Sequence, residues 1–300
     1  MTSLNMHGSG IIVQHKLPNL KDKPYGGVWS INDQDAIATV KIEHRPYNTT
    51  DLQEFLHDYA AWMQKGHNIH GIERFTHLAY ANGTTEVFDK FYQRHTDRRL
   101  RLWRGEYFYH QIQARELFKE WAWIEDGDIL ENDVVAVSMP FSDTGGIPPG
   151  YQLVMEQCEQ LNVPVMIDMA YVNLSKSTNF NIDFRCIEVI ATSLSKVFPV
   201  GHMRIGLRLM QNYVDDTLSA YCNQTTPYLN TSSVHLGHRL IKLYKPQWLW
   251  DKYHLKQHEV CNELGVAPSN CVILGVDHLN KYDEYNRGGK SNRLCFSKIW

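Results

Sequence analysis

The chain has 300 residues, of which 43% are hydrophobic and 12% aromatic, so it is long and apolar enough to bury a large core. Its formal net charge is −3, without the basic excess that binding to a phosphate backbone requires, and we expect neither nucleic acid nor another polyanion as a partner. The six cysteines form no CxxC pair, and no run approaches ~18 apolar residues, so we expect a cytoplasmic protein with reduced thiols and no membrane span.

The first 48 residues predict an N-terminal arm. They contain the turn-forming stretches NLKDKPYGG and EHRPYN, and no hydrophobic periodicity extends far enough to predict a helix or a strand. A large domain is expected from residue 49 to residue 210. It opens with TDLQEFLHDYAAWMQKG, which has a T-x-x-Q capping box, apolar residues at helical spacing, and Gly66 as its end signal.

Strand and helix patterns alternate after this first helix. The strand-like segments are FTHLAYANG, RLRLW, DVVAVSMP, VPVMIDMAY and CIEVIATSLS, and the helical ones include TTEVFDKFYQRH, EYFYHQIQARELFKEW and PPGYQLVMEQCEQLN. Because the strands are apolar almost throughout, we expect them to be buried on both faces. The sequence therefore predicts an α/β fold with a mostly parallel sheet that is covered by helices on both faces.

The strand signal fades after about residue 210. A long helical stretch, SSVHLGHRLIKLYKPQWLWDKYHLKQHEVCNELG, is interrupted near Pro246 and leads to a short tail. Residues 211–300 are therefore predicted to form a smaller second domain, with no internal repeat and no low-complexity linker.

Fifteen histidines raise the question of a metal site. The HxxH spacing occurs at His67/His70 and at His235/His238, but neither pair has an acidic or cysteine third ligand in a matching frame. We therefore expect no metal, and interpret these histidines as surface or partly buried side chains.

Polar residues follow three of the predicted strands. In a parallel sheet the carboxyl ends of the strands meet at one edge, where ligands bind. The side chains that would converge there are Thr84, Thr85, Asp168, Tyr171, Ser193, Ser195 and Lys196. A helix that begins after Gly83 would direct free N–H groups at a phosphate, and Arg204 could complete that site.

Each of these residues also has a purely structural interpretation. Tyr171 could be a core tyrosine, Ser193 and Ser195 ordinary strand-end hydroxyls, and Lys196 a solvated charge at the mouth of a strand. Asp168 is harder to explain in that way, because a carboxylate behind four apolar residues needs a cation or a protonated ring nitrogen nearby. Lys196 and Asp168 together therefore favour a chemical site.

The same residues carry a resemblance to a known family. ANGTTE, SMPFSDTG, DMAYVNLS and SLSKVFPVGHMRIG, read together, resemble the class I and II aminotransferases of the fold-type I pyridoxal-phosphate enzymes over roughly residues 76–206. The resemblance implies a large domain that binds pyridoxal 5'-phosphate and a small α/β C-terminal domain. That second domain would be shortened here, because 96 residues follow Arg204.

The resemblance also implies roles for individual residues. Lys196 would bind the cofactor as an aldimine and then act as the base for the α-proton, and Asp168 would keep the pyridine nitrogen protonated. Tyr171 would donate a hydrogen bond to the ring oxygen. Tyr107 would stack on the ring, although a one-residue shift would give Phe108 or Tyr109 instead. The phosphate would be held by Gly83, Thr84, Thr85, Ser193, Ser195 and Arg204.

One place near the expected substrate differs from the family pattern, and another follows it. The family commonly reads N-P-x-N-P-T-G where this chain reads SMPFSDTGG, which puts Ser142 or Asp143 at the position of the asparagine beside the cofactor. The RLCFS stretch is similar to the family's R-[IL]-S-F ending, so Arg293 would bind the substrate carboxylate with its planar guanidinium. The alternative is that Arg293 is a solvated loop residue.

The implied activity is transamination between an amino acid and an oxo-acid. Because the same cofactor chemistry also supports β-elimination and decarboxylation, a lyase or a decarboxylase stays open. A catalytically weak cofactor-binding relative is the third alternative, since Ser142 and the shortened domain both depart from the family. The family further implies a homodimer, in which PYGG or Tyr47 of the arm could reach a cofactor, either its own or that of the neighbouring subunit.

Overall fold

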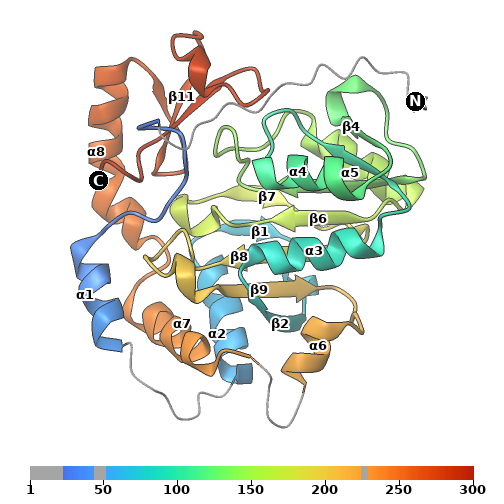
Figure 1. Ribbon diagram of the computed structural model, residues 1–300, viewed down its shortest axis with the longest axis horizontal. Coiled ribbons are helices and arrows are strands. Elements are labelled where there is room, and N and C mark those ends of the chain that lie inside the picture. The colour runs from blue at the N-terminus through green and yellow to red at the C-terminus, as the bar shows by residue number, and fades with distance from the viewer. Residues whose placement is uncertain (1–22, 44–51, 224–228) are drawn as a thin grey trace, which may run out of the picture.

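The structure, a computed structural model, describes residues 23–43, 52–223 and 229–300, and its centre is a seven-stranded sheet (Figure 1). In spatial order the strands are β2 (His77–Asn82), β9 (Ile205–Met210), β8 (Ile187–Ser193), β6 (Val165–Asp168), β5 (Asp133–Ser138), β3 (Arg99–Leu102) and β4 (Trp121–Trp123). Every residue of β5 and β6 is buried, as the continuous apolar segments predict for strands covered on both faces. Every residue of β9 is buried as well, although this strand was not among those predicted.

The direction of the strands decides where the predicted site residues meet. β9 is antiparallel to both of its neighbours, β2 and β8, whereas β8, β6, β5, β3 and β4 are parallel. β2 therefore runs in the same direction as β8 and β6. The carboxyl ends of β2, β6 and β8 lie at one edge of the sheet, and the mostly parallel fold is confirmed.

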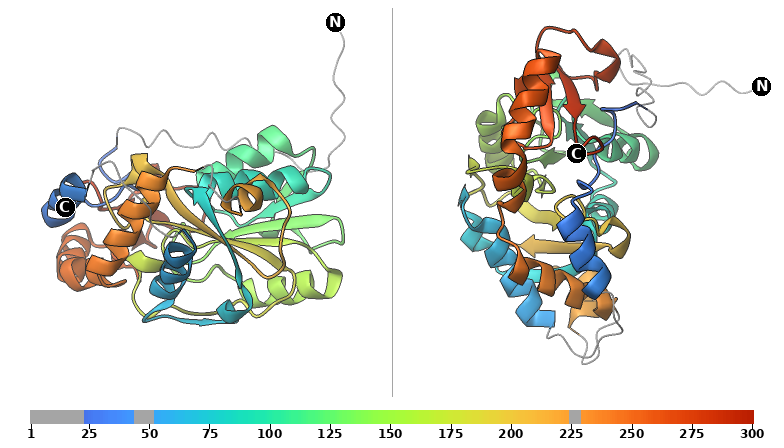
Figure 2. Two further views of the ribbon diagram at one scale, coloured as in Figure 1. Left: turned by 90° about the horizontal axis from the view of Figure 1, so that it is seen from below. Right: turned by 90° about the vertical axis from the view of Figure 1, so that its left-hand side faces the viewer.

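Helices cover both faces of the sheet, also as predicted. α3 (Thr84–Arg94) and α4 (Phe108–Leu117) lie on one face, and α2 (Leu52–Gln64) and α5 (Tyr151–Leu161) lie on the other (Figure 2). α2 and α3 turn an apolar stripe to the core that includes Phe55, Tyr59, Phe88 and Tyr92. The capping box expected before α2 lies outside the described residues.

Shorter elements complete the part of the chain around the sheet. They are α1 (Gln34–Glu43), the parallel pair β1 (Asn68–His70) and β7 (Asn179–Asn181), α6 (Thr217–Cys222), and 3₁₀ turns at Ile72–Arg74, Ile124–Asp126, Val172–Leu174 and Gly201–Met203. Within the predicted arm, α1 was not expected. Its apolar residues show no amphipathic period, so the helix has no hydrophobic pattern by which to recognise it.

The C-terminal part contains two helices and a second sheet. α7 (Thr231–Leu243) and α8 (Trp248–Leu264) match the predicted helical stretch, and the chain leaves helical geometry between them, next to Pro246. β10 (Ala267–Pro268), β11 (Leu274–Asp277) and β12 (Asn292–Cys295) form an antiparallel sheet, and a 3₁₀ turn at Asp283–Tyr285 lies between β11 and β12. These strands have two to four residues, too few to show a period. The domain boundaries at residues 48 and 210 stay a prediction.

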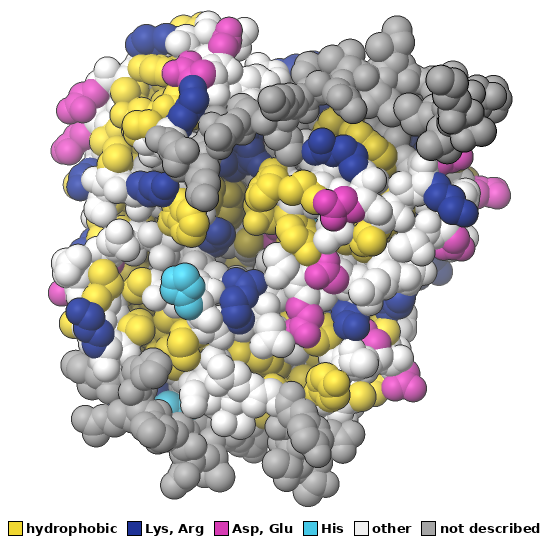
Figure 3. Space-filling model, in the orientation of Figure 1, with side chains coloured by type: hydrophobic (Ala, Val, Ile, Leu, Met, Phe, Trp, Pro, Cys, Tyr) yellow, Lys and Arg dark blue, Asp and Glu magenta, His cyan; other side chains and the backbone are white. Residues whose placement is uncertain are grey.

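Charged side chains of both signs are interspersed on the face drawn in Figure 3, and the surface is hollowed near the centre of that face, where hydrophobic side chains gather. Among residues 23–43, 52–223 and 229–300, no helix combines the length and the apolar character that a membrane crossing requires.

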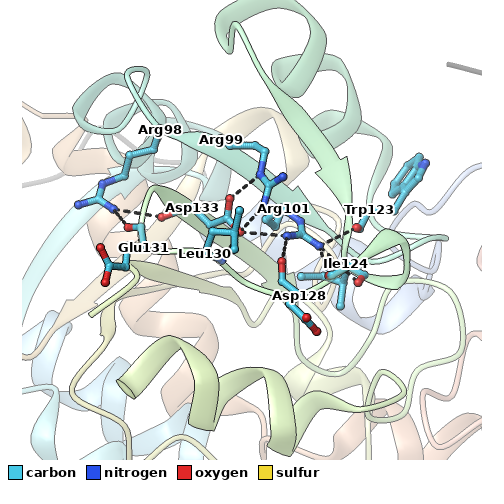
Figure 4. A network of polar contacts seen from close by, with 10 residues as sticks. Arg98, Arg99, Arg101, Trp123, Ile124, Asp128, Leu130, Glu131 and Asp133 are labelled. Carbon is cyan, nitrogen blue, oxygen red and sulfur yellow. Dashed lines mark hydrogen bonds and ion pairs between the residues drawn. The ribbon is translucent and has the colours of Figure 1, made fainter. Parts of the chain in front are cut away.

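A buried arginine on β3, next to the edge strand β4, holds this side of the sheet together. The Arg101 side chain is 2% exposed and forms an ion pair with Asp133 on β5, with 2.9 Å between Nη1 and Oδ2. Its guanidinium also donates to the backbone carbonyls of Asp128, Trp123 and Gly127, so it holds the segment between β4 and β5 in place (Figure 4). Arg99 donates two further hydrogen bonds to the Asp133 carboxylate.

Replacing Arg101 with methionine is expected to lower the free energy of unfolding by about 3–5 kcal/mol, because the variant removes the buried one of the two arginines that pair with Asp133 and leaves several backbone carbonyls without a donor. Urea denaturation measures this change. The matched control is Arg104→Met, which removes an arginine whose side chain is 34% exposed and should change the free energy of unfolding by about 0–1 kcal/mol. Equal effects of the two substitutions would contradict the structural role of Arg101.

Candidate active site

A cavity of about 570 Å³ lies at the edge of the sheet where β2, β6 and β8 end. The predicted site residues that line it are Thr84, Thr85, Tyr107, Ser142, Asp168, Tyr171, Ser193, Ser195, Lys196, Arg204 and Arg293. Residues that line it without having been predicted from their pattern include Val28, Trp29, Ser138 and Arg287, and Phe108, an alternative to Tyr107 in the sequence, lines it as well. Gly83 is not part of the lining itself, but lies directly behind it.

One end of the cavity is shaped to bind an anion. Gly83 precedes α3 with a φ of 77°, and α3 has no side chain that caps its N-terminus, so N–H groups of its first turn are free. The Arg204 guanidinium packs against Gly83, where a Cβ atom would collide with it, and its Nη2 donates to Thr85 Oγ1 at 3.1 Å. Ser195 Oγ is buried and has no hydrogen-bond partner in the described chain.

Lys196 lies inside this cavity and not in solvent. Its Nζ donates to the backbone carbonyl of Val28 at 2.9 Å. Burial lowers the pKa of Lys196, and the nearby positive charges of Arg293 and Arg204 lower it further, against the opposing effects of Cys295 and Asp168. A lysine in such surroundings gives up its proton more easily, which is the property that a nucleophilic or basic amine needs.

Asp168 ends β6 with its carboxylate in the cavity. The residue is 4% exposed, and its Oδ1 accepts a hydrogen bond from the Ala170 amide at 2.9 Å. Its Oδ2 lies 3.8 Å from Nε2 of His110, a fully buried α4 residue whose Nδ1 contacts the Tyr92 hydroxyl at 2.5 Å. Asp168 forms no ion pair with a described lysine or arginine, so it is available to a cation from a ligand.

A buried carboxyl supports the other wall. Glu106 is fully buried and accepts hydrogen bonds from the amides of Tyr107 and Ser138 and from the Ser138 hydroxyl, at 2.6, 2.9 and 2.5 Å. Ser138 Oγ in turn accepts from the Ser142 amide at 2.7 Å. Burial raises the pKa of Glu106, and the charge of His110 and these hydrogen bonds oppose that shift. Glu106 therefore ties together the backbone that carries Tyr107 and Ser142.

Arg293 is a buried site residue and not a solvated loop arginine. It lies on β12 with 3% exposure, and its Nη1 donates to the Ser142 carbonyl at 2.8 Å. Nη1 also lies 3.4 Å from the Tyr171 hydroxyl. Burial raises the pKa of Tyr171, and the positive charge of Arg293 opposes the shift. The Nε atom of Arg293 is buried without a partner in the described chain.

The N-terminal arm closes part of the cavity. Gly26, Gly27, Val28 and Trp29 line it. The segment is attached to the C-terminal part, because the Cys295 amide donates to the Tyr25 carbonyl and the Trp29 amide donates to Ser297 Oγ, each at 3.0 Å. PYGG thus reaches the cavity of its own chain, whereas Tyr47 lies outside the described residues.

A separate group of possible metal ligands is formed by Glu54, Asp58 and His238. His238 Nε2 contacts Asp58 at 2.8 Å, and the Lys242 ammonium pairs with both carboxylates. A cationic side chain therefore already neutralises this group, and it gives no support to a metal site.

A seven-stranded sheet with one antiparallel strand, helices on both faces and a cavity at the strand ends make up the fold around this site. Solved structures with this fold match the chain closely in shape, but at low identity. An aromatic aminotransferase from Pyrococcus horikoshii OT3 has a TM-score of 0.64 at 11% identity, with 90% of each chain covered. An aspartate aminotransferase from Thermotoga maritima has a TM-score of 0.65 at 12% identity, over 91% of this chain and 86% of that one.

The similar structures are not all aminotransferases. A pyridoxal-phosphate-bound C–S lyase from Staphylococcus hominis has a TM-score of 0.66 at 11% identity, over 93% of this chain and 86% of that one. No family model and no curated protein matches the sequence. The predicted fold is therefore confirmed, while identities this low leave the reaction to be argued from the site.

Proposed function

We propose that this chain is a pyridoxal-phosphate-dependent aminotransferase that moves an amino group between an amino acid and an oxo-acid, with Lys196 as the residue that binds the cofactor. The observation that carries the proposal is the position of three groups in one cavity: the Lys196 amine, the Asp168 carboxylate, which pairs with no described lysine or arginine, and the anion site at Gly83 and Arg204.

The residues of the cavity fit pyridoxal phosphate. Ser195 Oγ, which has no partner in the described chain, and the free N–H groups of α3 are donors for phosphate oxygens, together with Ser193, Thr84, Thr85 and Arg204. Asp168 has an oxygen to pair with a protonated ring nitrogen, and Tyr107 presents an aromatic ring to the cavity. When bound, the cofactor supplies an electron-withdrawing ring that stabilises negative charge at the substrate α-carbon.

The protein groups then have separate tasks. Asp168 holds the ring-nitrogen proton, and Tyr171 and Ser142 offer hydroxyl groups to the ring oxygen. Lys196 in its neutral form accepts the α-proton and returns it, which its lowered pKa favours. Arg293 binds the α-carboxylate. Because Arg293 and Tyr171 are in contact, substrate and cofactor positions are fixed by one set of side chains.

Spectroscopy of the half-reactions tests the proposal. An amino acid should convert the visible band of the loaded protein into that of the amine form of the cofactor, and an oxo-acid should restore the band. Release of pyruvate and ammonia would instead indicate a lyase, the alternative that the C–S lyase neighbour favours. A cofactor band with no conversion by a broad panel of amino acids would indicate a binding protein without turnover.

Conservative replacements should separate the two arginines of the proposed site. Arg293→Lys is expected to raise the KM for amino acids, since an ammonium cannot meet both carboxylate oxygens, at a cost of about 1.5–3 kcal/mol. Arg204→Lys should weaken cofactor retention first. Steady-state kinetics and dialysis of the loaded protein measure the two effects, and the opposite pattern would mean that the two roles are assigned wrongly.

We further propose that the protein is a homodimer in the cytoplasm. The six cysteines are all free and buried, as a reducing compartment favours, and the rim residues Trp29 and Phe108 are 54% and 43% exposed at the cavity. Light scattering should give the mass of two chains. A monomer with full turnover would contradict the dimer.

A further inference from the structure

Arg287 is a second buried arginine in the cavity, and no step of the proposed transamination uses it. It is 6% exposed, and it lies on the loop between β11 and β12, six positions before Arg293. A guanidinium carries five N–H donors. Within the described chain, the only hydrogen bond of Arg287 is a long one, from Nη1 to Ser142 Oγ at 3.3 Å.

Arg287 and Arg293 converge on the same serine. The Nη1 atoms of both residues lie within 3.4 Å of Ser142 Oγ. Two cations this close repel each other, and burial together with the charge of Arg293 lowers the pKa of Arg287 to about 10. Such an arrangement costs free energy unless an anion is placed against it.

The protein supplies this anion only in part. Asp143 is buried near both arginines, and its Oδ2 accepts a hydrogen bond from Ser291 at 3.3 Å, but neither arginine forms an ion pair with it within 4.0 Å. Burial raises the pKa of Asp143 to about 6. The donors of Arg287 therefore have no carboxylate from the described chain to bind, although the residue lines the cavity.

One planar guanidinium is enough to bind one α-carboxylate through two parallel hydrogen bonds. Arg293 already provides that group in the proposed function. A second guanidinium beside it has unused donors that fit a second carboxylate on the same ligand.

We propose that Arg287 is a specificity-determining residue that binds the side-chain carboxylate of a dicarboxylic amino acid or oxo-acid. The catalytic meaning of this proposal rests on the proposed function. The binding of a dicarboxylate between Arg287 and Arg293 is independent of the proposed function, because it depends only on side chains that the structure places together.

Calorimetry with succinate, glutarate and butyrate tests the binding directly, on the purified protein with and without added pyridoxal phosphate. At least one dicarboxylate should bind more tightly than butyrate, and Arg287→Gln should weaken its binding about 10- to 150-fold, the range for a hydrogen bond to a charged group. Lys290→Gln is the matched control, because it removes an exposed positive charge three positions away and should leave the preference unchanged.

Kinetics with amide isosteres extend the test to the reaction. Arg287→Gln should lower kcat/KM for glutamate or aspartate by the same factor, and should leave kcat/KM for glutamine and asparagine unchanged. An equal loss of kcat/KM for the acids and the amides would mean that both arginines bind one carboxylate, which would overturn the proposal. An unchanged kcat/KM for both kinds of substrate would overturn it as well. If the protein binds no cofactor at all, the proposed function fails, whereas the calorimetric comparison still decides the role of Arg287.

Discussion

Lys196→Ala is expected to abolish transamination and the visible absorbance band of the lysine-bound cofactor. The alanine removes both the amine that would bind the cofactor and the base that would move the α-proton. General-base catalysis alone contributes about 10²–10⁴-fold to a rate, so the loss should be at least of that size. Absorbance after reconstitution and a coupled assay with an amino donor and an oxo-acid measure the two losses.

The fold should survive this substitution. Within residues 23–43, 52–223 and 229–300, the Lys196 side chain makes one hydrogen bond, to the Val28 carbonyl, and burial of its charge is unfavourable in the absence of a ligand. Lys256→Ala, at an exposed position on α8, is the matched control and should keep both the band and the activity. Turnover by folded Lys196→Ala at the wild-type rate would remove the central residue of the proposed mechanism.

Asp168→Asn should leave cofactor binding largely intact but lower kcat by about 10²–10⁴-fold. A neutral amide cannot hold the ring nitrogen protonated, and removing one partner of a buried charge pair costs about 3–5 kcal/mol, where each 1.36 kcal/mol is a tenfold change in rate. Steady-state kinetics on the fully loaded variant measure the loss of kcat, and the absorbance of the loaded protein reports cofactor binding.

The control for Asp168 is Asp126→Asn, a carboxylate on the surface pair with Arg104, which should react at the wild-type rate. Near-normal turnover by Asp168→Asn would show that this carboxylate serves the fold, for example through its hydrogen bond to the Ala170 amide, and not the reaction.

The central sheet could be predicted from the sequence because its strands are buried on both faces. The runs that became β5, β6 and β8 are apolar almost without interruption, and the polar residues that follow β6 and β8 mark the edge where ligands bind. β9, which contains the buried Arg208, was not among the predicted strands, and its residue pattern carries no mark of its antiparallel direction. β10–β12 are too short to show a period.

The supporting residues of the site escaped prediction for a different reason. Glu106 lies just before α4, and His110 lies on it. Their roles depend on contacts with Ser138 at the end of β5 and with Asp168 at the end of β6, and the spacing of residues in the sequence does not reveal these contacts. Arg287 lies in a glycine-containing stretch that resembles a solvated loop, and only the folded chain buries it against Ser142. Arg293 was recognised through its resemblance to a family motif, with its burial left open.

The departure at Ser142 has a structural counterpart. Ser142 accepts hydrogen bonds from Arg293 and Arg287, and its own amide is held by Ser138. The serine therefore connects the proposed cofactor site to both arginines.

The most direct test of the account is to reconstitute the chain with pyridoxal phosphate, reduce it with borohydride, and locate the modified residue by peptide mass spectrometry. Reduction makes the link between a lysine amine and the cofactor permanent. We expect the cofactor to be attached to the peptide that contains Lys196, and the Lys196→Ala variant to carry none. Attachment at a different lysine, or no attachment to the wild-type chain, would contradict it.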